Sequence, residues 1–249
     1  MANLFRTNNP ALNQKAFEGV RALGERVMTI EGTVNRAGIL LVCVVATAAW
    51  TWGSFQRAQD PAQVMVPVMI GVFGGFIVAL VTIFKKQWSP ITAPIYALLE
   101  GLALGGISAM LNTAYPGIAI QAVGLTFGTL AVMLMAYRSG LIRATARFKM
   151  AVVSATGAIA LVYLISMGLS FFGVRTPYLN DASPIGIGIS LVIVGVAALN
   201  LVLDFDLIET GAAQGAPQYM EWYGAFGLMV TLVWLYLEML RLLSKMRRR

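Results

Sequence analysis

Histidine is absent from this 249-residue sequence, and cysteine occurs once, as Cys43 within an apolar run. The absence of histidine excludes histidine-based catalysis and zinc sites of the Cys/His type. A single cysteine excludes a disulfide scaffold. No nucleophile–base pair, metal motif or cofactor fingerprint accompanies the carboxylates, so we expect neither an enzyme nor a cofactor-binding protein.

Charged side chains are scarce, at 12% of the chain against roughly 25% in an average soluble domain, whereas 58% of the residues are hydrophobic. A formal charge of +7 could indicate a nucleic-acid partner in a soluble protein. Here the basic residues lie in short segments between apolar runs, where they orient a chain in the bilayer. We therefore predict a multi-pass integral membrane protein surrounded by lipid, with no nucleic-acid partner.

The apolar runs are long enough for membrane spans, each needing about 20 residues. The predicted fold class is an all-α membrane protein of about seven transmembrane helices. A polar tail (1–36) precedes the membrane domain (37–243), and a basic tail (244–249) follows it. The predicted spans are 37–56, 61–84, two spans within 86–138 that are divided by a turn at 112–117, 150–174, 184–203 and 222–243.

The distribution of Lys and Arg predicts a cytoplasmic N-terminus. With seven crossings, eleven basic residues lie inside and seven outside, and the five in the C-terminal segment contradict the rule. Placing both termini inside improves the count but requires a late segment to re-enter the membrane. Within the N-terminal tail, apolar residues at helical spacing over 12–23 suggest an amphipathic helix at the membrane surface, with a solvated tail as the alternative.

Acidic residues concentrate near the C-terminus, since six of the eleven lie within 176–240, a stretch without Lys or Arg. Three of them, Asp204, Asp206 and Glu209, follow the predicted sixth span directly. A spacing of three residues places Asp206 and Glu209 on one helix face, whereas Asp204 points elsewhere.

A carboxylate in the last turn of a helix meets the negative end of the helix dipole, and no basic residue is near this cluster in sequence. Protonation or a bound cation would relieve that cost, and Ca²⁺ prefers oxygen ligands. Asp204 and Asp206 are therefore candidate Ca²⁺ ligands. The alternative is that the sixth span ends at Leu203 and the three acids lie in a wet loop.

Two further glutamates lie within predicted spans. Glu100 stands between leucines in the third span and should face a cavity or a polar partner, with a structural hydrogen bond as the alternative reading. Glu238 precedes Arg241 by three residues and is predicted to lie near the membrane surface.

Several stretches resemble the Bax inhibitor (TMBIM) family, most closely its bacterial YccA-like branch. The resemblance implies a bundle whose last helix is surrounded by the other six, in a bacterial inner membrane. It also implies a pH-sensitive calcium leak, in which an aspartate of the sixth span shares a proton with one of the seventh. The matching stretches are 9–12, 28–29, 32–35, 99–102, 204–208 and 223–226.

In this resemblance Asp204 takes the place of the first aspartate, Thr231 stands where the second is expected, and Glu100 matches a glutamate of the third span. The implied function is a Ca²⁺ leak gated by protonation near Asp204, with H⁺ as the second ion and with Asp206 and Glu209 as auxiliary groups. The alternative is a regulatory membrane protein that modulates a membrane-bound protease or a stress response through residues 1–36.

Overall fold

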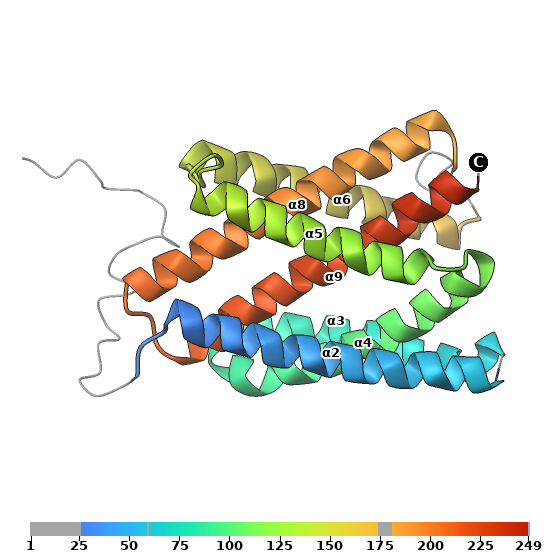
Figure 1. The fold of residues 1–249 in the computed structure, drawn as a ribbon, viewed down its shortest axis with the longest axis horizontal. Helices are drawn as coiled ribbons and strands as arrows, with labels where there is room; N and C mark the ends of the chain where they lie inside the picture. Colours follow the sequence, from blue (N-terminus) through green and yellow to red (C-terminus); the bar gives the residue numbers. More distant parts are fainter. Residues whose placement is uncertain (1–25, 59, 174–180, 249) are drawn as a thin grey trace, which may run out of the picture.

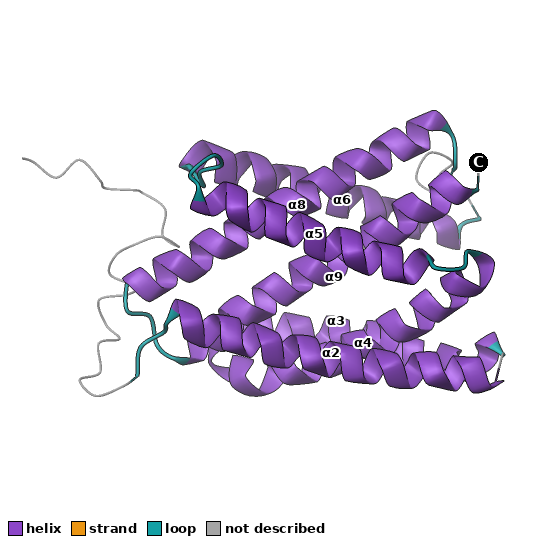
Figure 2. Ribbon diagram, in the orientation of Figure 1, coloured by secondary structure: helices purple, strands orange, loops and turns teal. Residues whose placement is uncertain are grey.

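The computed structural model describes residues 26–58, 60–173 and 181–248. In this part of the chain, seven helices are long and apolar enough to cross a membrane, which confirms the predicted all-α fold class (Figures 1 and 2). The elements are α2 (Ile30–Ala58), α3 (Pro61–Phe84), the short 3-10 helix η2 (Lys86–Trp88), α4 (Ser89–Ala114), α5 (Ile118–Arg138), α6 (Ala146–Phe171), α8 (Pro184–Ala213) and α9 (Tyr219–Arg247).

Local capping groups explain several helix boundaries. Asp60 accepts a hydrogen bond from the N–H of Ala62 at the start of α3, and Ser183 accepts one from Gly186 at the start of α8. The predicted turn between the third and fourth spans is confirmed. Gly117 adopts a left-handed conformation there (φ 81°), and its N–H donates to Asn112 Oδ1 at 2.9 Å.

Several helices extend beyond the charge-free runs, among them α6, which begins at Ala146 rather than residue 150. Helix α2 begins at Ile30 rather than residue 37, and α9 continues to Arg247. Helix α8 continues to Ala213, so the three clustered acids lie on a helix, and the wet-loop alternative is wrong. The end of a charge-free run marks where the apolar surroundings end. The helix itself can continue beyond that point, because its polar side chains find partners there. The predicted amphipathic helix at 12–23 lies outside the described residues.

Helix α9 occupies the centre of the bundle (Figure 1). It packs against α2 and α4 on one side and against α5 and α8 on the other. Helix α3 packs mainly on α4, and α6 reaches α9 through a hydrogen bond from Tyr163 to Glu238. The last helix is therefore central, as the family resemblance implies, with four neighbours forming most of its contacts.

Helix α6 is the least buried of the seven spans. Three polar side chains, each seven residues from the next, connect it to its neighbours. Lys149 forms an ion pair with Asp206 of α8, Thr156 accepts from Asn200 of α8 at 2.8 Å, and Tyr163 donates to Glu238 of α9 at 2.8 Å. We call these three side chains the α6 polar stripe.

The two ends of the described chain lie at opposite ends of the bundle, as an odd number of crossings requires (Figure 1). Three of the five C-terminal basic residues bond to other groups within the bundle. Arg241 pairs with Glu238, Lys245 donates to Ser190 and to the carbonyl of Gly186, and Arg247 donates to Gln121 and to the carbonyl of Pro116.

Candidate functional site

Asp204 lies on α8 and directs its carboxylate toward α9. A Cβ atom added at Gly227 would lie 3.6 Å from Asp204 Oδ1, and the Thr231 side chain lies against the same carboxyl group. Oδ2 is enclosed and has no hydrogen-bond partner among the described residues. We call this contact between α8 and α9 the α8–α9 seam.

No cation balances Asp204 within the described part of the chain, because the three ion pairs found there involve Asp206, Glu221 and Glu238. Removing an ionised carboxylate from water without a partner costs several kcal/mol. A proton or an incoming cation would remove that cost. The seam can therefore hold a proton or receive a cation.

The other two acids of the cluster have different neighbours. Asp206 forms an ion pair with Lys149 of α6, and Glu209 accepts a hydrogen bond from the Tyr137 hydroxyl of α5. Both line a polar pocket of about 460 Å³ at the end of α5, together with Tyr137, Arg138, Ile142, Arg143 and Ala144. The pocket thus combines carboxylates with arginines and is not a purely acidic site.

The described residues contain no group of three or more His, Cys, Asp or Glu side chains placed to hold a metal ion. Asp204 and Asp206, the candidate Ca²⁺ ligands, face α9 and α6 respectively. Ca²⁺ coordination by this pair stays a prediction.

Glu100 is separate from the seam. Its carboxylate lies beside the Tyr96 hydroxyl, one turn earlier on α4, and a Cβ added at Gly75 of α3 would lie 2.9 Å from Oε1. The Tyr96 ring in turn packs edge-on against Phe226 of α9, with ring centroids 5.0 Å apart. The structure therefore brings Thr231 to Asp204 but places Glu100 between α3 and α4.

A family model described as Bax inhibitor 1 like matches residues 9–248, which include all seven helices and every candidate residue above. The chain belongs to the Bax inhibitor 1 like family. No curated protein and no solved structure matches it.

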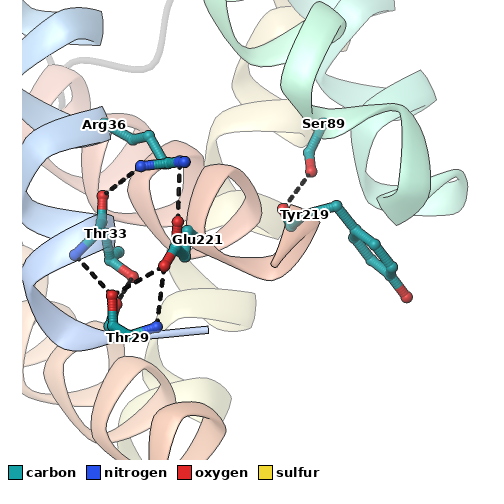
Figure 3. Close-up of polar contacts among 7 residues, drawn as sticks. Thr29, Thr33, Arg36, Ser89, Tyr219 and Glu221 are labelled. Carbon is teal, nitrogen blue, oxygen red and sulfur yellow. Dashed lines mark hydrogen bonds and ion pairs between the residues drawn. The ribbon is translucent and has the colours of Figure 1, made fainter. Parts of the chain in front are cut away.

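The sequence did not single out the most strongly bonded acid of this Bax inhibitor 1 like protein, Glu221. Its side chain lies among Thr29, Thr33 and Arg36 (Figure 3). The residue stands at the start of α9 and is 2% exposed. Its Oε1 accepts hydrogen bonds from the N–H and the hydroxyl of Thr29, each at 2.9 Å, and Oε2 lies 3.0 Å from Arg36 Nε in an ion pair that is not aligned as a hydrogen bond. Its partners lie at the other end of the sequence, where no local pattern could indicate them.

Glu238 is enclosed by the bundle, with 1% of the residue exposed, and its position near the membrane surface stays a prediction. Its Oε1 accepts from Tyr163 of α6 and from Arg241, each at 2.8 Å. The spacing of three residues from Glu238 to Arg241 was a visible signal for this pair. Both buried glutamates of the Bax inhibitor 1 like protein thus have an arginine partner, which Asp204 lacks within the described residues.

Proposed function

We propose that this Bax inhibitor 1 like protein is a passive cation leak, with Ca²⁺ as the ion, gated by protonation of Asp204. The supporting observation is a carboxylate enclosed at the α8–α9 seam without a cationic partner in the described chain. Buried acids inside membrane proteins that lack a fixed countercharge are typical of ion and proton pathways.

The gate would work through the hydration of Asp204. A protonated carboxyl is neutral and fits a dry contact between α8 and α9. An ionised carboxylate requires water or a cation, and either one must enter the seam and separate the helices. Because a carboxylate gains charge as pH rises, the leak should increase with pH and should stop when Asp204 is protonated.

Calcium flux into liposomes loaded with a calcium indicator tests this function over a pH series. We expect Ca²⁺ entry to rise with pH in the unaltered protein and to lose that dependence in Asp204→Asn. Asp181→Asn, which alters an exposed acid just before α8, should retain the profile. Absence of flux at every pH, or an unchanged profile in Asp204→Asn, would contradict the proposal.

Thr231→Asp provides a gain-of-charge test. It places a second carboxylate against Asp204, and two like charges at one site need a shared proton. The leak should then require a higher pH than in the unaltered protein. A profile identical to that of Thr231→Asn would show that position 231 does not act on Asp204.

The proposed orientation has the N-terminus in the cytoplasm of a bacterial inner membrane. The basic residues that contradict this orientation lie at the C-terminus, where Arg241, Lys245 and Arg247 are bonded to partners within the bundle. The positive-inside rule then rests on the early loops, which favour a cytoplasmic N-terminus. Membership of the YccA-like branch stays a prediction.

A further inference from the structure

We propose that residues 26–36, which we call the clasp, close the α8–α9 seam at the end of the bundle nearest Asp204, and that their release controls access to it. The clasp comprises the segment before α2 and the first two turns of that helix. As a regulation of the Asp204 site, this inference rests on the proposed function. Its evidence is three successive layers of contacts.

The outermost layer is a backbone contact between the clasp and the loop that joins α8 to α9. The N–H of Met28 donates to the carbonyl of Ala216 at 2.7 Å, and the N–H of Gln218 donates to the carbonyl of Arg26 at 3.1 Å. Val27 and Pro217 form an antiparallel bridge between the same two segments. These bonds therefore fix the clasp to the loop that joins α8 to α9.

The second layer centres on Glu221, one turn into the bundle. Its carboxylate binds Thr29 and Arg36 (Figure 3). The Arg36 guanidinium also lies 5.4 Å from the centre of the Trp222 ring. A Cβ at Gly32 would lie 2.1 Å from Glu221 Oε1, so any larger residue here would displace the carboxylate from its partners. The close approach of α2 to α9 thus depends on one glycine and one carboxylate.

The third layer closes the seam itself. A Cβ added at Gly224 would lie 3.1 Å from Ile208 of α8, 3.3 Å from Thr33 and 3.5 Å from Met28, so these three side chains converge on one point of α9. Gly227, which faces Asp204, follows Gly224 by three residues, or about 4.5 Å along the helix. Asp204 therefore lies about one turn beneath the clasp.

These layers make the clasp a cover over the seam. A water molecule or cation that follows the seam from the α8–α9 loop must pass Met28 and Thr33 before it reaches Asp204. Besides the backbone bonds of the outermost layer, the hydrogen bonds and the ion pair from the clasp to α9 converge on one side chain, Glu221, so loss of that carboxylate releases Thr29 and Arg36 together.

Chemical access to the seam can be measured without any ion flux. In a Cys43→Ser background, Thr231→Cys places a thiol against Asp204, and a cationic, membrane-impermeant methanethiosulfonate reports its exposure to water. Arg36→Leu opens the clasp by removing charge, and Gly32→Ala opens it by steric contact with Glu221. The matched controls are Gly38→Ala, on the same helix with no atom within 4 Å of the added Cβ, and Glu31→Gln, an exposed acid of the same first turn.

We expect both opening variants to react about tenfold faster or more than the background, equivalent to about 1.4 kcal/mol of easier opening, and both controls to stay within about twofold. Equal rates in all five proteins, or equal acceleration by the opening and control variants, would overturn the clasp. Faster labelling without Ca²⁺ flux would instead preserve the clasp and reject the leak. Asp204-dependent Ca²⁺ flux with labelling rates unchanged by the opening variants would preserve the leak and reject the clasp.

Discussion

Glu221 and Glu238, the two buried glutamates of α9, have electrostatic surroundings opposite to those of Asp204 on α8. Glu221 and Glu238 each have an arginine at ion-pair distance, 3.0 and 2.8 Å away, and each connects α9 to another helix. Asp204 faces the stretch of α9 between them and has no such partner in the described chain. Paired acids of this kind fasten helices, whereas an unpaired one is free to exchange a proton or a cation.

This contrast predicts different costs for removing each carboxylate. A buried ion pair that loses one partner leaves the other uncompensated, which destabilises a protein strongly. An acid without a countercharge stabilises nothing by its charge, so its neutral replacement should be tolerated. Unfolding by SDS in mixed micelles can rank the variants.

The largest loss should follow Glu221→Leu. We expect the free energy of unfolding to fall by about 3 kcal/mol, at the lower end for a broken buried pair because the Arg36 side chain is 22% exposed. The double variant Arg36→Leu/Glu221→Leu should recover part of the loss, since no buried charge is left alone. A double variant less stable than Glu221→Leu would show that the pair does not act as a unit.

Gly32→Ala should cost about 2 kcal/mol, because the new methyl group must displace the Glu221 carboxylate. Gly38→Ala, on the same helix, should raise the free energy of unfolding through the higher helix propensity of alanine. Apart from that gain, it should change the free energy of unfolding by no more than about 0.5 kcal/mol. Equal effects of the two substitutions would mean that the contact with Glu221 does not limit residue 32.

Glu238→Gln should have a smaller effect, about 1 kcal/mol, because the Arg241 side chain is 39% exposed and can be solvated. Tyr163→Phe removes the hydroxyl shared by Glu238 and Arg241, so a double-mutant cycle between positions 163 and 238 should give a non-zero coupling energy. Strict additivity would remove Glu238 from the comparison as a fastening group.

Asp204→Asn should have the smallest effect on unfolding, within about 0.5 kcal/mol or slightly stabilising, since it removes an uncompensated carboxylate and keeps its shape. A loss as large as that of Glu221→Leu would show that Asp204 has a partner that fastens the seam. Such a result would abolish the contrast on which its proposed role depends.

The spans were predictable because charge is excluded from lipid, and α3 begins and ends where its apolar run does. The start of α2 and the end of α8 could not be predicted in this way. Arg36 and Asp206 lie within these helices, because their charges are compensated by Glu221 and Lys149. These partners are 185 and 57 residues away along the chain, and no local pattern in a single sequence connects residues so far apart. Helical periodicity did separate Asp204 from Asp206, since two residues turn a helix by about 200°.

The α6 polar stripe has a consequence for how the bundle assembles in the bilayer. Lipid tails are as apolar as leucine. Apolar contact with neighbouring helices therefore stabilises a lipid-exposed helix such as α6 very little. Its recognition of α8 and α9 then depends on three bonds at a heptad interval, formed by Lys149, Thr156 and Tyr163. Sliding α6 by one turn would break all three bonds at once, so the stripe sets a single register for a helix that lipid alone would leave free to slide.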